Sequence, residues 1–316
     1  MKPRRGLALA ARITAVLLLV LALAAAILMQ PDRLARIVLG AVGDAAGLDI
    51  AFSGEARYRL RGTPLLEVHD LSVRVPGHDA PLLDAGRALV SLPWSTVRRR
   101  GAGPVVLERI ELDRPVLDLP RLQAWLAERP AGDGRLPTLD RGIAVRDGRV
   151  LGDGWLLRDL QLRIPALAPD APVRGTARGT LDTASPPLVH FDLGLAASRP
   201  ADGAGRGARG RLRFEHPDWR LPAAIAASGP LRMDGDALWA APLRVGISAA
   251  FVGDGDPLPF TLGAHGPLRL RGGTATLAPA TLVLHGGGQV PALQARGRAA
   301  LGRALLLEFE GSMPAW

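Results

Sequence analysis

Apolar and polar residues alternate with a period of two over most of the chain beyond residue 56. In residues 57–61, Tyr58 and Leu60 lie on one face of the expected strand and three arginines lie on the other. Such alternation is typical of half-buried β-strands, because successive side chains of a strand point to opposite faces of the sheet. Repeats of this pattern up to residue 309 predict roughly sixteen strands of the length common in antiparallel sheets. The chain is therefore expected to be mainly β.

The apolar positions of these segments are candidates for one continuous lining of the sheet. The candidate lining residues are Ile110, Leu112, Leu160, Leu162, Ile164, Val189, Phe191, Leu193 and Leu212. In the strand expected around residue 111, alternation points Ile110, Leu112 and Val116 into the apolar interior. The charged residues between them are expected to face solvent, and these are Arg109, Glu111 and Asp113. Pro115 follows at once, so this strand should be an edge strand, bend or end there.

Two Asp-Gly dipeptides interrupt the alternating segments. Asp147-Gly148 and Asp153-Gly154 are both predicted to form hairpin turns, because this dipeptide favours the positive backbone angles that tight turns require.

Two or three short helices are expected beside the strands. Residues 31–47 have apolar residues at helical spacing, namely Leu34, Ile37, Val38, Ala41, Val42 and Ala45. This helix should plug or cap the end of the sheet, and a helix lying on a membrane surface is the alternative. Residues 121–128, between Pro120 and Pro130, form a second amphipathic helix. Residues 93–97 are expected to form a turn or a third helix.

An uncharged and almost wholly aliphatic run from Ile13 to Met29 follows a basic leader. As a helix the run is about 26 Å long, and the preceding residues 7–11 extend it to the roughly 30 Å of a bilayer core if Arg12 snorkels. The charge distribution predicts a single-pass anchor with a cytoplasmic N-terminus and the bulk of the chain outside. A cleaved signal peptide is the alternative, because alanines at 22, 24 and 26 have the spacing of a cleavage site.

Composition excludes several kinds of chemistry. The formal net charge is +9, and four of these charges lie in the leader, so the remainder is only mildly basic. Because the chain has no cysteine, disulfides, thiol catalysis and thiolate metal sites are excluded. The high content of glycine (38) and proline (27) favours turn-rich β-structure.

Several sequence blocks stand in a distinctive order after the expected anchor and helix. They are Gly47–Gly54, Val68–Val73, Val90–Pro93 and, most specific of all, Ile110–Leu119 ahead of Trp125. In this order they resemble the AsmA family of envelope proteins, whose relatives include TamB and YhdP. The resemblance covers most of the chain, which is shorter than the long relatives.

The resemblance implies a non-enzymatic protein anchored in the bacterial inner membrane, with its bulk in the periplasm and an open, curved β-groove. Such a protein would bind phospholipid or another acyl lipid and contribute to phospholipid transport and outer-membrane biogenesis. Other envelope proteins are further candidate partners, and nucleic acid is not. The implied regions are a leader and anchor (1–31), a helix with the first β region (32–130) and a repetitive antiparallel β region (131–316).

Small residues in the alternating segments fit a groove. Gly175, Ala177 and Gly179 leave little side-chain volume to fill the gap of about 10 Å between two packed sheets. The candidate lining would then leave room for acyl chains. The alternative is a closed β-sandwich that serves as a scaffold or chaperone-like factor in the assembly of outer-membrane proteins.

The sequence contains no recognisable catalytic, cofactor or metal motif. Gly-x-Ser-x-Gly, His-Glu-x-x-His and Gly-x-x-x-x-Gly-Lys are all missing, and the six histidines are scattered. Residues 205–210 match Gly-x-Gly-x-x-Gly, but a strand pattern follows them where a dinucleotide site requires a helix. We therefore expect no catalytic residue, no cofactor and no metal.

Overall fold

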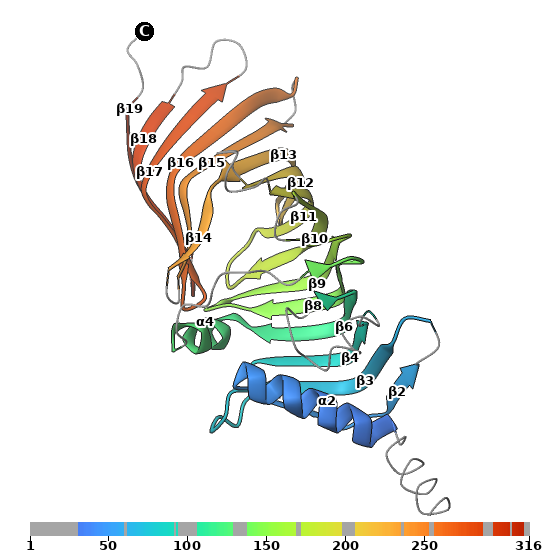
Figure 1. Ribbon diagram of the computed structural model, residues 1–316. Coiled ribbons are helices and arrows are strands. Elements are labelled where there is room, and N and C mark those ends of the chain that lie inside the picture. Colours follow the sequence, from blue (N-terminus) through green and yellow to red (C-terminus); the bar gives the residue numbers. More distant parts are fainter. Residues whose placement is uncertain are drawn as a thin grey trace, which may run out of the picture.

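The computed structural model describes residues 31–59, 62–91, 93, 106–128, 138–168, 172–197, 206–234, 237–252, 256–286, 293–303 and 305–312. Within them the chain forms one long, curved and open sheet of 17 strands, two short α-helices and a separate pair of two-residue strands (Figure 1). The prediction of a mainly β chain with an open sheet and short helices is confirmed. The turn or helix predicted at 93–97 lies outside the described residues except for Pro93.

The elements follow the chain in a simple order. The first are α2 (Pro31–Ala46), β1 (Asp49–Phe52), β2 (Ala56–Arg59), β3 (Leu65–Arg74), β4 (Leu83–Ser91), β5 (Val106–Leu107), β6 (Arg109–Asp118), α4 (Leu119–Ala127) and β7 (Thr138–Leu139). Next come β8 (Ile143–Leu151), β9 (Trp155–Ile164), β10 (Val173–Thr183), β11 (Leu188–Ala197), β12 (Arg206–His216) and β13 (Trp219–Gly229). The last are β14 (Leu231–Asp234), β15 (Ala237–Phe251), β16 (Leu258–Arg271), β17 (Thr274–Gly286), β18 (Leu293–Leu301) and β19 (Leu305–Ser312).

Strands that are neighbours in sequence are mostly neighbours in the sheet, joined by antiparallel pairing. At the N-terminal edge, β1 and β2 both pair with β3. One pair departs from the predicted antiparallel order, since β6 and β8 run parallel with Ile110 beside Ile143. A parallel pair requires a crossover connection, and the connection between β6 and β8 contains α4.

Helix α2 covers one face of the sheet at its N-terminal end. Ala35 is completely buried and belongs to one cluster with Val68 of β3. Asp32 accepts a hydrogen bond of 3.2 Å from the backbone N–H of Ala56, which fixes the start of the helix on β2. The prediction that this helix caps the end of the sheet is confirmed. Val42, which the pattern placed on its buried side, is 51% exposed.

None of the described helices is long and apolar enough to cross a membrane. The expected anchor at residues 13–29 lies outside the described residues and stays a prediction.

Several adjacent strands turn a corner at a single residue with a positive φ angle. These residues are Asp70 (53°) in β3, Arg114 (53°) in β6, Asp147 (52°) in β8 and Asp159 (54°) in β9. In β4, Gly86 lies beside this line, and a Cβ on it would collide with the guanidinium group of Arg114. The positive φ interrupts the extended conformation, so two consecutive side chains point outward at each corner. In β3, Val68 and Leu71 are consequently both buried although they are three residues apart.

The Asp147-Gly148 dipeptide therefore does not form the predicted turn. It lies inside β8, next to the corners of β6 and β9, whereas Asp153-Gly154 does connect β8 to β9 as predicted. Asp tolerates the left-handed conformation that both arrangements require, so the dipeptide alone does not distinguish them. Pro115 lies just past the corner of β6, and of the three outcomes predicted for this strand, a bend is the one that occurs.

In the C-terminal half the strands bend at proline-containing bulges instead. The pairing register shifts where Pro242, Pro267 and Pro279 lie in β15, β16 and β17. Proline lacks the N–H that a regular ladder uses and is confined to such irregular positions in a sheet interior. The bulges lie at a different level of the sheet from the corners, because the corner of β9 is level with Ala249 of β15 and the bulge of β15 lies between Ala240 and Leu243.

A contact between distant parts of the chain closes one corner of the curved sheet, where the lower ends of β16 and β17 approach α4 in Figure 1. The side-chain oxygen of Gln123 in α4 accepts a hydrogen bond of 2.7 Å from the backbone N–H of Gly273. The side-chain nitrogen of Gln123 donates to the backbone oxygen of Leu270 at 3.0 Å. The indole N–H of Trp155 donates to the backbone oxygen of Gly273 at 2.6 Å. We call this set of contacts the clasp.

Candidate functional site

Cross-strand pairing arranges the inward side chains in rows that run across the sheet. The longest, which we call the central row, contains Val68, Ala88, Leu112, Val145, Leu162, Ala177, Leu193, Gly210, Ile225, Ile247, Leu262, Leu284 and Leu293. Each member is directly paired with the next, and every one is aliphatic or glycine. We call the face that carries this row the inner face, and it is the face that α2 covers at the N-terminal end.

All nine candidate lining residues lie on the inner face. Leu112, Leu162 and Leu193 belong to the central row. The rows beside it contain the other six, namely Ile110, Leu160, Ile164, Val189, Phe191 and Leu212. The facing predicted for Ile110 and Leu112 thus agrees with the register of β6. The inward facing predicted for Val116 is wrong, because the positive φ angle at Arg114 shifts the alternation, so that Pro115 pairs with the inward Ala85 and Val116 pairs with Asp84 on the outer face.

The sequence reading omitted members of the central row in the C-terminal strands. Ile225, Ile247, Leu262 and Leu284 continue the row, and they stand in alternating segments as regular as those that were singled out. Alternation alone could have found them, since each is the apolar member of its local period of two.

The large side chains of the inner face are poorly covered beyond the reach of α2. Among the described residues after 140, the buried hydrophobic residues are all alanines, namely Ala177, Ala223, Ala237, Ala240, Ala280 and Ala295. The leucines, isoleucines and valines of the central row in this region are only half-buried. A face of this kind is unusual, because a sheet normally buries its apolar side against a second layer.

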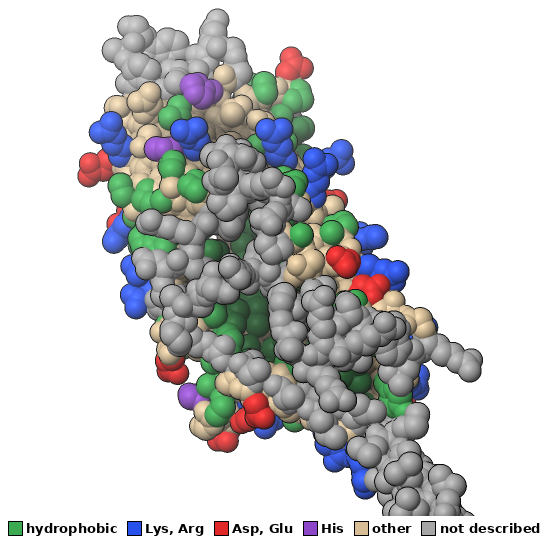
Figure 2. All heavy atoms as spheres, viewed as in Figure 1, with side chains coloured by type: hydrophobic (Ala, Val, Ile, Leu, Met, Phe, Trp, Pro, Cys, Tyr) green, Lys and Arg blue, Asp and Glu red, His purple; other side chains and the backbone are tan. Residues whose placement is uncertain are grey.

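The uncovered face forms a groove with a cavity in it. In Figure 2 hydrophobic side chains line the hollow in the middle of the view, and charged side chains gather toward the margins. A cavity of about 640 Å³ at this part of the sheet is lined by Phe191, Leu212, Ala223 and Ala249 of the inner face and by outer-face residues of the same strands, among them His190, Asp192, Arg211 and Arg213. This volume is in the range of small-molecule sites, and the inward side chains at the site are all apolar. The described residues form an open sheet and not the closed sandwich considered as an alternative.

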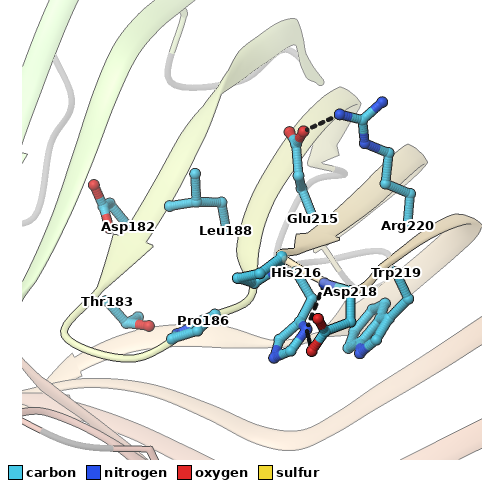
Figure 3. Close-up of a pocket in the computed structure, with 10 residues that line it drawn as sticks. Asp182, Thr183, Pro186, Leu188, Glu215, His216, Asp218, Trp219 and Arg220 are labelled. Carbon is cyan, nitrogen blue, oxygen red and sulfur yellow. Dashed lines mark hydrogen bonds and ion pairs between the residues drawn. The ribbon is translucent and has the colours of Figure 1, made fainter.

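A second cavity, of about 760 Å³, lies at the strand ends around the β12–β13 turn (Figure 3). The rings of His216 and Trp219 stack there, with centroids 5.1 Å apart and an interplanar angle of 8°. The backbone N–H of Asp218 donates to Nδ1 of His216 at 3.2 Å. Glu215 and Arg220 form an ion pair of 3.1 Å at the side of the cavity. This strand edge therefore combines an aromatic surface with polar and charged groups.

On the outer face, Glu111 departs from the prediction that it faces solvent. Its side chain is only 4% exposed and contacts the guanidinium groups of Arg87, Arg109 and Arg146. Carboxylates are tolerated at such depth only when cations pair with them. Alternation assigned the correct face, but the long side chains of the neighbouring strands cover the residue.

The same network changes the titration of a neighbouring pair. Arg87 donates hydrogen bonds to Glu67 at 2.7 Å and to Asp113 at 2.8 Å. The hydrogen bond from Arg87 lowers the pKa of the Glu67 carboxyl, and the same bond raises the pKa of Arg87. Glu67 and Arg87 therefore each stabilise the charged form of the other.

Thr180, His190 and Glu215 form a chain of hydrogen bonds on the outer face. Thr180 Oγ1 lies 3.0 Å from Nδ1 of His190, and Nε2 of His190 lies 2.9 Å from Glu215. The bond to His190 lowers the pKa of Glu215. This order of groups resembles a hydrolase triad, but Thr180 is buried and pairs with strands on both sides. Backbone N–H groups that are engaged in ladders cannot also form an oxyanion hole, so the arrangement fits a structural network.

No group of three or more potential metal ligands occurs among the described residues. No protein-family profile, curated protein or solved structure matches the chain.

Proposed function

We propose that this chain is an AsmA-like protein of the bacterial envelope that binds lipid acyl chains along its inner face. In this proposal it contributes to phospholipid transport and outer-membrane biogenesis. Residues 13–29 hold it in the inner membrane, and residues from 32 onward lie in the periplasm.

The observation that carries the proposal is the central row, which crosses the sheet without a polar side chain and is largely uncovered beyond α2. An apolar surface of this extent gains free energy from any apolar cover. Acyl chains are a suitable cover, because each CH₂ group removed from water contributes about 0.8 kcal/mol and requires no polar partner. The small residues in the row, such as Ala177 and Gly210, leave space for such chains.

In this proposal the protein is not an enzyme. The groove carries aliphatic side chains where an enzyme would need titratable groups, and the polar networks of the described residues lie on the outer face or at strand ends. Acyl chains held only by apolar contacts would be free to move along the groove, as transport requires.

A pair of photo-crosslinking residues tests the proposal. Leu193 points to the inner face and its neighbour Asp192 is exposed on the outer face, so the two positions share a strand and differ in facing. Each is replaced in turn in the full chain, expressed in bacterial cells, and adducts are identified by mass spectrometry. Lipid adducts at position 193 that greatly exceed those at 192 are expected. Equal adducts at both positions, or none at either, would rule out the groove.

The same experiment separates lipid from a protein client. A scaffold for outer-membrane proteins would present the same apolar face, but its adducts at position 193 would contain peptide. Peptide adducts without lipid adducts would replace our proposal with the scaffold function.

A further inference from the structure

Four large apolar side chains protrude from neighbouring strand ends along one edge of the groove. Trp219 is 42% exposed, Phe251 57%, Val252 70% and Leu258 58%. Phe251 pairs with Leu258 across β15 and β16, and the start of β13 lies beside the end of β15. The four residues therefore belong to adjoining strand ends. We call them the apolar lip.

The lip is continuous with the groove. Phe251 and its partner Leu258 lie two residues beyond Ala249 and Phe260, so they share the inner face with Ala223 and Leu212. Val252 follows Phe251 and lines the 640 Å³ cavity with residues of both faces. An acyl chain on the inner face near Ala249 would therefore contact only apolar inward side chains on its way to the edge of the sheet at Phe251 and Leu258.

Polar groups border the lip on one side. Trp219 stacks on His216, and Arg220 next to it has a side chain that is 75% exposed. Tryptophan and arginine with an apolar neighbour are typical of the boundary between hydrocarbon and water, because each combines an apolar body with a polar end.

We propose that the apolar lip inserts into the surface of a lipid bilayer and that acyl chains pass between bilayer and groove at this edge. The inference rests on the proposed function, to which it adds the place of membrane contact.

A bilayer fits the lip better than a folded protein partner does. The exposed side chains project from the ends of hairpins, whereas a stable protein interface has a broad, closely packed core. Insertion into a bilayer needs only apolar side chains that reach past the backbone, with polar groups remaining at headgroup level.

Site-specific fluorescence tests the inference. Because the chain has no cysteine, Val252→Cys can be labelled uniquely with an environment-sensitive dye. Leu306→Cys is the matched control, since Leu306 is 41% exposed and lies on the outer face of β19. The full chain, held in an amphipathic polymer, is mixed with vesicles of phosphatidylcholine and phosphatidylethanolamine. We expect a blue shift and an increase in emission at position 252 and no change at 306. Equal responses at both positions, or no response at 252, would overturn the inference.

Substitutions give a second measurement. Phe251→Ser should weaken association with the same vesicles about tenfold, because burial of one large apolar side chain is equivalent to at least that change in an equilibrium constant. Leu306→Ser should leave association unchanged, and unaltered association of Phe251→Ser would contradict the lip. If position 193 still yields lipid adducts while the lip does not respond, only the inference fails. If position 193 yields no lipid adducts, the proposed function fails.

Discussion

At its N-terminal end the sheet has its inner face covered by α2, whereas the inner face of β9–β19 has no comparable layer among the described residues. Both regions have the same alternation and belong to the same central row. Val68, Leu71 and Val73 are at most 8% exposed under the helix, and among the described hydrophobic residues of the C-terminal region only alanines reach such burial. The difference shows that apolar alternation specifies which side chains face inward, and that burial depends on what covers them.

The two regions also differ in their polar contacts. The outer face near β4, β6 and β8 contains a closely packed network of carboxylates and arginines around Glu111. On β18 and β19 the ion pair of Arg298 and Glu308 is exposed by more than half on both side chains. The ion pairs on the outer face of the N-terminal region are thus more deeply covered than the ion pair on β18 and β19.

The largest expected contrast is between charged substitutions in the central row. Val68→Asp would bury an unpaired carboxylate beneath α2 and should cost more than about 3 kcal/mol of stability or prevent folding. Leu193→Asp in the uncovered region leaves the new charge within reach of water and should cost less than about 1 kcal/mol. Guanidinium unfolding followed by tryptophan fluorescence measures both. Similar losses would mean that the two regions are covered to the same degree.

On the outer face, Glu111→Lys should destabilise the protein by about 3 kcal/mol, because it places a fourth cation at a buried position in contact with three arginines. The matched change in the C-terminal region is Glu308→Lys, which disrupts an exposed ion pair and should have little measurable effect. Thermal unfolding of the two variants compares them directly. A large effect at 308, or none at 111, would contradict the difference between the networks.

The clasp connects the two regions, and Gln123→Ala should cost about 2 kcal/mol. The substitution leaves the buried N–H of Gly273 and the carbonyl of Leu270 without their side-chain partner. Gln294→Ala, at an exposed position of β18, is the control and should change stability by less than about 0.5 kcal/mol. Hydrogen exchange at Gly273 provides a local measurement, and unchanged protection there would show that the clasp is not formed in solution.

The smallest expected effect is dependent on pH. Because Arg87 lowers the pKa of Glu67 below its usual 4.5, the pair stabilises the folded state above that value, and the stabilisation is lost as the pH falls through the lowered pKa. Glu67→Gln should therefore cost about 1 kcal/mol at pH 7 and progressively less below pH 4.5. Urea unfolding of the wild-type chain and of Glu67→Gln at pH 7 and below pH 4.5 tests this. If the difference in stability between the two proteins does not change with pH, the Glu67–Arg87 ion pair is not the cause.

Much of the fold could be predicted from local sequence because its signals are local. A period of two identifies each strand and its inward side chains, and all nine candidate lining residues lie on the inner face for this reason. The amphipathic helix ahead of the sheet and the one after β6 were likewise predictable from their spacing.

The corrected expectations depend on contacts between distant residues. Asp147-Gly148 has the same preference for positive φ angles as Asp153-Gly154. It forms a corner within a strand and not a turn, because Arg114 and Asp159 adopt positive φ angles at neighbouring positions of the adjacent strands. Glu111 has the alternation of an exposed residue, and it is buried because arginines from β4 and β8 reach across it.

The sequence by itself determined the strands, their facing between corners and an inner face without polar side chains along its central row, since these follow from residue type and spacing. Tertiary structure decided that β6 and β8 are parallel, that the clasp closes one corner and that α2 covers one end of the inner face while the rest stays open. These features depend on loop paths and on pairs of residues up to 150 positions apart, such as Gln123 and Gly273. The spacing of residues within one segment does not specify which distant segment packs on it. The open extent of the inner face is therefore known only from the tertiary structure.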